Sequence, residues 1–121
     1  MKILMVDDMA SMRSVICHIL SELGYSGTEQ AKDGVEALRK LRNATFDFVI
    51  SDWNMPNMNG QELLENIRND DGLKHIPVLM VTAETERSVV INAAKKGVNA
   101  YIVKPFTPQQ LQEKITKIFA S

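Results

Sequence analysis

Acidic side chains come directly after two short segments that have the apolar character of buried strands. Asp7 and Asp8 follow the segment at 3–6. Asp52 follows the segment at 46–51. Carboxylate oxygens are the ligands that hard divalent cations such as Mg²⁺ prefer, and an ionised carboxylate is also a nucleophile. These residues are therefore candidates for a cation site at which one acid attacks an electrophile such as a phosphoryl group.

A hydroxyl group and an ammonium group stand at the ends of two further apolar segments. Thr82 follows the segment at 77–81, and Lys104 follows the segment at 100–103. Two carboxylates about 4 Å apart repel each other by roughly 4 kcal/mol at an effective dielectric constant near 20, so three cannot stay ionised together without a cation or a raised pKa. A divalent ion and Lys104 would supply that positive charge and would spread the charge of transferring phosphoryl oxygens.

Each of these residues also has an ordinary structural interpretation. An aspartate at the end of a strand commonly caps a helix or forms a turn. Asp8 could cap the helix that follows, Asp52 could form an Asx-turn before Pro56, and Lys104 could be a solvated surface charge. We prefer the joint interpretation, because the polar residues share one position relative to their strands. Trp53, beside Asp52, is expected to be partly exposed.

Five apolar segments alternate with five amphipathic segments along the chain. Continuous rather than alternating hydrophobicity is typical of strands that are covered on both faces. The predicted strands are 3–6, 27–31, 46–51, 77–81 and 100–103. The predicted helices carry their apolar residues from Met12 to Leu23 before Gly24, from Val35 to Leu41, from Leu63 to Ile67, from Val89 to Ala94 before Gly97, and from Leu111 to Phe119 after the start signals Thr107, Pro108 and Gln110.

This alternation on short connections predicts an α/β fold, a doubly wound five-stranded parallel sheet with five helices on its two faces. Right-handed crossovers leave few possible strand orders. The order 2-1-3-4-5 is established for flavodoxin-like folds, and we take it from those folds rather than from the residues. Ligand sites of such open sheets lie beyond the carboxyl ends of the strands, which is where the acids, the threonine and the lysine fall.

The composition narrows the class of protein further. The chain of 121 residues has one cysteine and a formal net charge of −1. This length suits a single domain, and the charge lacks the basic patch of a nucleic-acid-binding protein. Cys17 has no partner for an internal disulfide, which is typical of a reducing compartment. The apolar start before Asp7 is too short for a signal peptide or a membrane span. We expect a soluble cytoplasmic monomer that neither binds nucleic acid nor inserts into a membrane.

The motifs resemble, in order and over the whole chain, those of the receiver domain of two-component response regulators. The matching motifs are Asp7-Asp8, Asp52, Thr82-Ala83 and Lys104-Pro105-Phe106. The resemblance implies the same doubly wound fold and a single receiver domain over 1–121, with no output domain. It also implies a signalling phosphoacceptor rather than an enzyme, although one that assists its own phosphorylation and dephosphorylation.

The resemblance implies a role for each matching residue. Asp52 would accept the phosphoryl group from a histidine kinase, with Mg²⁺ as the cofactor, and the Lys104-Pro105 bond would be cis. Thr82 and Lys104 would contact the phosphoryl group. The ring of Tyr101 would then turn inward, although a half-buried tyrosine at a sheet edge has the same pattern. The implied metal ligands are Asp7 (mainly through water), Asp8, Asp52 and the backbone carbonyl of Asn54. The small side chain of Ala83 would give the phosphoryl group access to the site. The residues that would tune the phosphoryl lifetime are Asn54 and Glu84.

Within the family, the chain is similar to the chemotaxis members. The segments that carry this similarity are 52–56, 82–84 and 101–106. The similarity implies phosphorylation by a CheA-type histidine kinase and docking on the flagellar motor switch protein, with a phosphatase as a further partner. The implied docking surface consists of the fourth helix, the fifth strand and the fifth helix. A stand-alone phosphorelay receiver with the same pocket is the alternative.

Three other functions fit the residues less well. A flavin or nucleotide carrier of this fold needs a glycine-rich loop after the first strand, and the segment 7–11 has no glycine. A haloacid-dehalogenase-like phosphatase has its two acids two residues apart, whereas Asp7 and Asp8 are adjacent. A DNA-binding regulator needs a basic face, which this distribution of charge does not offer.

Overall fold

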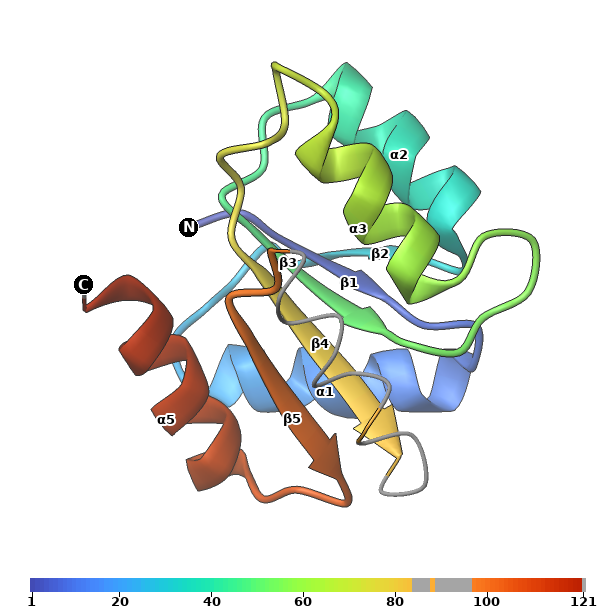
Figure 1. The fold of residues 1–121 in the computed structure, drawn as a ribbon. Coiled ribbons are helices and arrows are strands. Elements are labelled where there is room, and N and C mark those ends of the chain that lie inside the picture. Colours follow the sequence, from blue (N-terminus) through green and yellow to red (C-terminus); the bar gives the residue numbers. More distant parts are fainter. Residues whose placement is uncertain (84–87, 89–96, 121) are drawn as a thin grey trace.

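Five parallel strands form the centre of the computed structural model, which describes residues 1–83, 88 and 97–120 (Figure 1). Their order is β2-β1-β3-β4-β5, as predicted, and each neighbouring pair is parallel. The strands are β1 (Ile3–Val6), β2 (Glu29–Ala31), β3 (Phe48–Asp52), β4 (Val78–Ala83) and β5 (Ala100–Lys104).

The ends of several strands differ from the predicted ends. β4 and β5 extend further, because their pairing continues through Thr82 with Val103 and through Ala83 with Lys104. β2 is shorter, since Gly27 has a φ of +80°, which is incompatible with strand geometry. The threonine and the lysine of the candidate site therefore belong to strands, and the sheet holds their backbones in place.

The part of the chain that the structure describes contains four helices. α1 ends just before Gly24, whose φ of +95° favours glycine. Thr107 and Gln110 form the predicted capping box of the last helix, with Pro108 in its first turn. The helices are α1 (Ala10–Glu22), α2 (Gly34–Asn43), α3 (Gly60–Arg68) and α5 (Pro108–Phe119). None of these four has the length and apolar character needed to span a bilayer. The fifth predicted helix, over Val89 to Ala94, lies outside the described residues.

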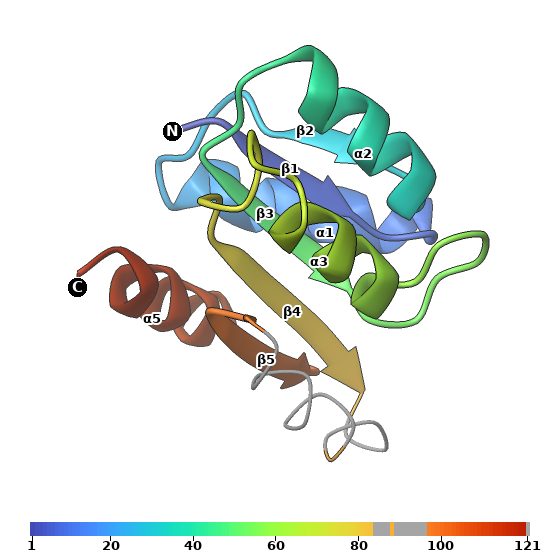
Figure 2. The ribbon, with the colours of Figure 1, turned by 45° about the horizontal axis from the view of Figure 1, so that its top comes forward.

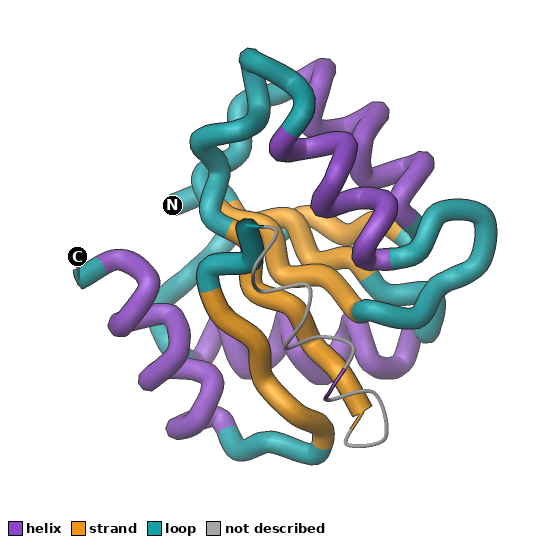
Figure 3. Tube along the Cα trace, viewed as in Figure 1, coloured by secondary structure: helices purple, strands orange, loops and turns teal. Residues whose placement is uncertain are grey.

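The helices cover both faces of the sheet, with α2 and α3 on one face and α1 and α5 on the other (Figures 1 and 2). Alternate residues of β1 divide between the two faces. Leu4 and Val6 pack in the core with α2 and α3, whereas Ile3 and Met5 pack in the core with α1 and α5. Figure 3 shows the resulting layer of strands between helices. Burial of each such side chain stabilises the fold by roughly 1.5–3 kcal/mol. Packing on both faces therefore holds the strands in place, and with them the residues at the carboxyl ends of the strands.

Candidate functional site

The carboxyl ends of β1 and β3 bring three carboxylates together. Val6 pairs with Ser51 across these strands, so the next residues, Asp7 and Asp52, are neighbours. One oxygen of each of Asp7, Asp8 and Asp52 lies within 4.8 Å of the others. Asp7 is fully buried and Asp52 is 7% exposed, whereas Asp8 is open to solvent. The prediction that these acids converge is confirmed.

The two oxygens of the buried Asp7 carboxylate have different surroundings. Oδ1 accepts from the backbone N–H of Met9 at 2.8 Å. Oδ2 is buried and accepts no hydrogen bond from any residue in the described ranges. A buried oxygen without a donor is costly, and a cation in the cluster would satisfy it. Asp8 does not cap α1, because Met9 holds the cap position and no side chain bonds there. The helix-cap interpretation of Asp8 is therefore wrong.

Lys104 contributes a positive charge to the cluster. Its Nζ lies 3.3 Å from Asp52 Oδ1 and 3.9 Å from Asp7 Oδ2. Its side chain is 24% exposed, so it is not the solvated surface lysine of the ordinary interpretation. The bond from Lys104 to Pro105 is cis, as the resemblance implied. Three carboxylates and one ammonium group leave two negative charges in excess (3 − 1), and the oxygen ligands suit a hard divalent cation.

Burial dominates the ionisation of the two enclosed acids. It raises the pKa of Asp52, although the charge of Lys104 and the N–H of Trp53, 2.9 Å from Oδ1, act in the opposite direction. Burial also raises the pKa of Asp7, against the hydrogen bond from Met9 and with the repulsion of Asp52. Acids whose pKa values are raised in this way become easier to ionise when a metal ion binds.

Thr82 and Ala83 form the end of β4, beside the end of β5. Thr82 is buried, and its hydroxyl donates a hydrogen bond to the carbonyl oxygen of Ala83 at 3.1 Å. Ala83 pairs with Lys104 in the sheet. Tyr101, earlier on β5, is partly buried, and Nζ of Lys114 lies 5.4 Å from the centroid of its ring. The threonine, the alanine and the lysine therefore share the sheet edge at which the acids lie.

The loop that follows Asp52 is more enclosed than the sequence suggests. Trp53 is 7% exposed, so the prediction of partial exposure is wrong. The N–H of Gly60 donates to the carbonyl oxygen of Trp53 at 2.8 Å, which folds the loop back, and the indole packs in the core with α2 and α3. Asn54 is exposed in this loop. Glu84, the other residue expected to tune the phosphoryl lifetime, lies outside the described residues.

A basic side chain near the acids was not foreseen from the sequence. Nη1 of Arg13 donates to the backbone carbonyl oxygen of Asp7 at 2.6 Å, and Nε donates to the side chain of Gln30 at 3.1 Å. Arg13 thus links the start of α1 to the ends of β1 and β2. The only signal in the sequence is an arginine one turn into a helix, and such a residue commonly faces solvent.

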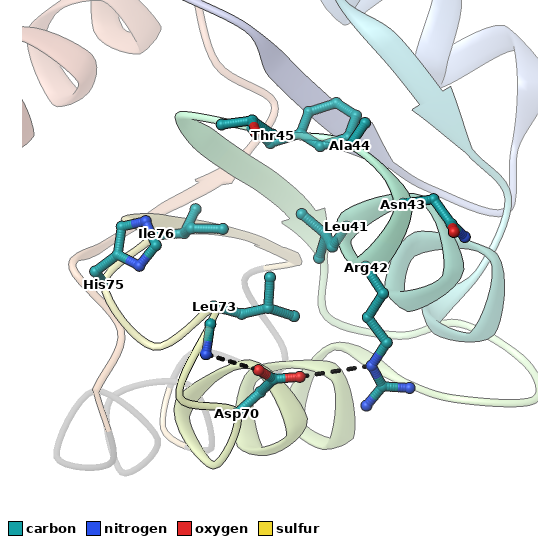
Figure 4. Close-up of a pocket in the computed structure, with 11 residues that line it drawn as sticks. Leu41, Arg42, Asn43, Ala44, Thr45, Asp70, Leu73, His75 and Ile76 are labelled. Atoms are coloured by element: carbon teal, nitrogen blue, oxygen red, sulfur yellow. Dashed lines mark hydrogen bonds and ion pairs between the residues drawn. The ribbon is translucent and has the colours of Figure 1, made fainter.

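A separate pocket of about 540 Å³ lies at the opposite edge of the sheet, beside the loops that precede β3 and β4 (Figure 4). Its lining includes the apolar side chains of Leu41, Leu73 and Ile76. Arg42 points toward Asp70 there, with Nε 3.5 Å from Oδ2. None of the residues predicted for the site lines this pocket. The acid cluster is therefore the candidate site.

Fold and site together define a class of protein. The sheet order, the acids at the carboxyl ends of β1 and β3 and the lysine that ends β5 are those of a phosphoaccepting signalling domain, as the motifs predicted. The family model of the response regulator receiver domain matches residues 3–116, and the chain belongs to this family.

Individual relatives agree with this assignment. The chain is 56% identical over 119 residues to the chemotaxis protein CheY-3 of Vibrio cholerae, and the alignment covers 98% of this chain and 92% of the relative. It is also 56% identical to the chemotaxis protein CheY of Pseudomonas aeruginosa, with 98% and 96% covered. The structure of the chemotaxis response regulator CheY4 of V. cholerae matches with a TM-score of 0.88 at 39% identity and covers 98% of both chains. The protein is therefore a response regulator closely related to chemotaxis proteins.

Proposed function

We propose that this response regulator accepts a phosphoryl group on Asp52 from a histidine kinase, with Mg²⁺ as its cofactor. The observation that carries the proposal is the position of Asp52. Its carboxylate lies 3.3 Å from the ammonium group of Lys104 and within 4.8 Å of two other carboxylates. Asp52 is also 7% exposed, whereas Asp7 is completely enclosed, so a phosphoryl donor reaches Asp52 more easily.

The metal ion would be held by Asp7, Asp8, Asp52 and the backbone carbonyl of Asn54. Asp7 would act mainly through water. Three features support this fit: the clustered carboxylates, their excess negative charge and the buried Oδ2 of Asp7, which has no donor among the residues that the structure describes. When bound, Mg²⁺ supplies positive charge to the oxygens of the phosphoryl group.

In the transfer, an oxygen of the Asp52 carboxylate attacks the phosphorus atom of a phosphohistidine. The new O–P bond forms as the P–N bond breaks, and the electron pair of that bond returns to the ring nitrogen that carried the phosphorus. The imidazole leaves as a neutral ring, with a proton already on its other nitrogen or with one taken up from water. Lys104 Nζ, 3.3 Å from the carboxylate, offers N–H donors to the phosphoryl oxygens. Water later attacks the phosphorus and releases phosphate. The protein assists both steps, but its product is a signal rather than a released metabolite, so we propose a phosphoacceptor and not an enzyme of turnover.

Thr82 and Tyr101 would convert phosphorylation into a change of surface. The hydroxyl of Thr82, which donates to the carbonyl of Ala83, would turn to a phosphoryl oxygen. The small side chain of Ala83 would leave room for the group to enter. Space vacated by Thr82 would admit the ring of Tyr101, and the surface of β5 and α5 would change with it. Asn54 and Glu84 would tune the phosphoryl lifetime.

The chemotaxis relatives support a role in the control of flagellar rotation. We propose a CheA-type kinase as the donor, the flagellar motor switch protein as the target, a phosphatase as a further partner and the cytoplasm as the location. The target would dock on β5, α5 and the predicted fourth helix. We also propose that residues 1–121 act as a single, monomeric receiver domain. A stand-alone phosphorelay receiver is the second candidate, and binding to a histidine phosphotransfer domain in place of the motor switch protein would favour it.

Acetyl phosphate with Mg²⁺, followed by intact-mass spectrometry, tests the central chemistry. The protein should gain the mass of one phosphoryl group, and Asp52→Asn should gain none. Asp71→Asn is the matched control, because its side chain is 97% exposed and lies in the loop at the opposite edge of the sheet, and it should be phosphorylated as the unmodified protein is. Full phosphorylation of Asp52→Asn would overturn the assignment of Asp52. An unchanged rate without Mg²⁺ would overturn the cofactor.

A further inference from the structure

The loop between β3 and α3 is tied to the start of α2 by one buried carboxylate. Asp33 is 4% exposed and lies at the cap position of α2. Its Oδ1 accepts from the backbone N–H of Glu36 at 2.8 Å, which caps the helix. Its Oδ2 accepts from Nδ2 of Asn57 at 2.9 Å, although Asn57 lies 24 residues further along the chain. Asp33 therefore uses its two oxygens for two different tasks.

Neighbouring contacts make this attachment close and specific. The N–H of Gly34 donates to the carbonyl oxygen of Met58 at 3.2 Å. A Cβ atom at position 34 would lie 2.7 Å from Cγ of Met58, so only glycine lets the helix approach the loop so closely. Asn57 has a φ of +66°, a conformation that asparagine, aspartate and glycine adopt more readily than other residues. The loop is thus held in a defined conformation from the side of α2.

The same loop carries Asn54, whose backbone carbonyl is the proposed third protein ligand of the metal ion. The loop begins at the carboxyl end of β3, where Asp52 lies, and closes through the bond from Gly60 N to Trp53 O at 2.8 Å. A carbonyl ligand has no side-chain rotamer of its own, so its direction depends on the conformation of the whole loop. A contact that fixes this conformation would therefore act on metal affinity.

We propose that Asp33 is a positioning residue for the metal site, which holds the Asn54 carbonyl in place through its hydrogen bond with Asn57. This inference rests on the proposed function, because it needs Mg²⁺ to bind at the acid cluster. Groups that orient metal ligands without touching the metal typically change affinity by about 10–100-fold when they are removed. The two hydrogen bonds from Glu36 and Asn57 also lower the pKa of Asp33, which keeps both oxygens available as acceptors at neutral pH.

The alternative is that Asp33 serves only as a helix cap, and Asp33→Ser separates the two roles. Serine caps a helix about as well as aspartate, because its hydroxyl oxygen can accept from the N–H of Glu36. It has no second oxygen to accept from Asn57, so the hydrogen bond to Asn57 is lost together with the negative charge, while the cap is kept. Asp33→Asn is the matched control for charge. It removes the negative charge but keeps a hydrogen bond to Asn57. For this bond the side-chain amide of Asn57 rotates by half a turn, so that its oxygen accepts from the amide N–H of residue 33.

Titration calorimetry with MgCl₂ and urea unfolding without metal should be measured for each variant. We expect Mg²⁺ to bind about tenfold more weakly to Asp33→Ser and with nearly unchanged affinity to Asp33→Asn. Asn57→Asp should also weaken binding, since it places two carboxylates face to face. The double variant Asp33→Asn with Asn57→Asp should recover the affinity, because the donor and the acceptor then exchange sides while the net charge stays constant.

Affinity of Asp33→Ser equal to that of the unmodified protein would overturn the positioning role and leave a helix cap alone. Weak binding by the double variant would overturn the hydrogen bond as the cause. A failure of the proposed function appears differently, since the unmodified protein would then show no Mg²⁺ binding at all, or Asp52→Asn would bind Mg²⁺ with full affinity; either result would remove the metal site and this role with it.

Discussion

Lys104 and Asp52 form a close ion pair at the end of the sheet, with Nζ 3.3 Å from Oδ1. One residue ends β3 and the other ends β5, and β4 lies between them. The pair is therefore made by strand order and not by proximity along the chain. Since two further carboxylates lie within 4.8 Å of Asp52, the ammonium group balances only part of the negative charge.

The first prediction concerns stability without metal. At the outer separation of 4.8 Å, two carboxylates repel by about 3.5 kcal/mol at an effective dielectric constant near 20, and Asp52 faces two of them. Its attraction to Lys104 at 3.3 Å is about 5 kcal/mol on the same scale. We expect Asp52→Asn to raise the free energy of unfolding in EDTA by about 1–2 kcal/mol, measured by urea unfolding. Asp71→Asn should leave it unchanged, and a loss of stability in Asp52→Asn would contradict the prediction.

The second prediction concerns Lys104→Met, which keeps much of the side-chain volume and removes the charge. Mg²⁺ should bind at least about tenfold more tightly, because a divalent cation no longer shares the cluster with an ammonium group. Phosphorylation by acetyl phosphate should become slower at saturating Mg²⁺, because the phosphoryl oxygens lose a donor. Titration calorimetry and intact mass measure the two effects. Lys117→Met on the exposed face of α5 is the control, and weaker Mg²⁺ binding by Lys104→Met would refute the charge argument.

The third prediction concerns pH. Burial raises the pKa of Asp52 from its ordinary value of 3.8, so over the range above 3.8 the native state without metal binds more protons than the unfolded state. The contribution of Asp52 to stability is therefore greatest at low pH and declines as pH rises through the raised pKa. With saturating Mg²⁺ the trend should reverse, because the metal requires the ionised form.

The difference in unfolding free energy between the unmodified protein and Asp52→Asn reports this effect, together with the part of the raised pKa of Asp7 that comes from repulsion by Asp52. The contributions of Glu29 and Asp33 to the pH dependence of stability cancel in this difference, because both proteins contain them. Hydrogen bonds lower the pKa of each acid, from Lys2 for Glu29 and from the N–H of Glu36 for Asp33. Those two acids stabilise the native state above their unfolded pKa values, and their contribution is lost as pH falls. A metal-free difference that does not vary with pH would show that Asp52 titrates normally.

The fourth prediction concerns Gly60, the first residue of α3. A Cβ atom there would lie 2.5 Å from the carbonyl oxygen of Asp52 and 2.9 Å from Cα of Trp53. Since these are backbone atoms at the end of β3, Gly60→Ala should destabilise the fold by about 1–3 kcal/mol and slow phosphorylation of Asp52. Gly72→Ala is the control, because its nearest neighbour is a side-chain oxygen of Asp70 at 3.3 Å. Equal urea midpoints for the two variants would rule out this close approach.

Much of the fold could be predicted because its signals are local. Two such signals depend on neighbouring residues alone: the continuous apolar run of β1, and the start of α5 at Thr107, Pro108 and Gln110. The ends of β4 and β5 were harder to predict, since they depend on pairing between two strands. The convergence of Asp7, Asp8, Asp52 and Lys104 could also be predicted, because parallel strands end at one edge.

Other parts of the site could not be predicted. The burial of Trp53 depends on how the following loop folds back, and the bond from Arg13 to the backbone of Asp7 depends on the position of α1. The contact between Asp33 and Asn57 joins residues 24 positions apart. No periodic pattern signals such a contact, because hydrophobic spacing reports which face of an element is buried and not which residue it meets. The roles of Thr82, Tyr101 and Ala83 remain predictions.

The sequence by itself determined which side chains stand at the ends of the strands and that the strands are covered on both faces. This information is local, since strand and helix geometry repeat over a few residues. Only the tertiary structure decided that Oδ2 of Asp7 accepts no hydrogen bond from the described residues, that Asp52 keeps some exposure whereas Asp7 has none, and that α2 holds the loop after β3. These features depend on differences of about an ångström between segments far apart in the chain, and close packing of the whole core sets such distances.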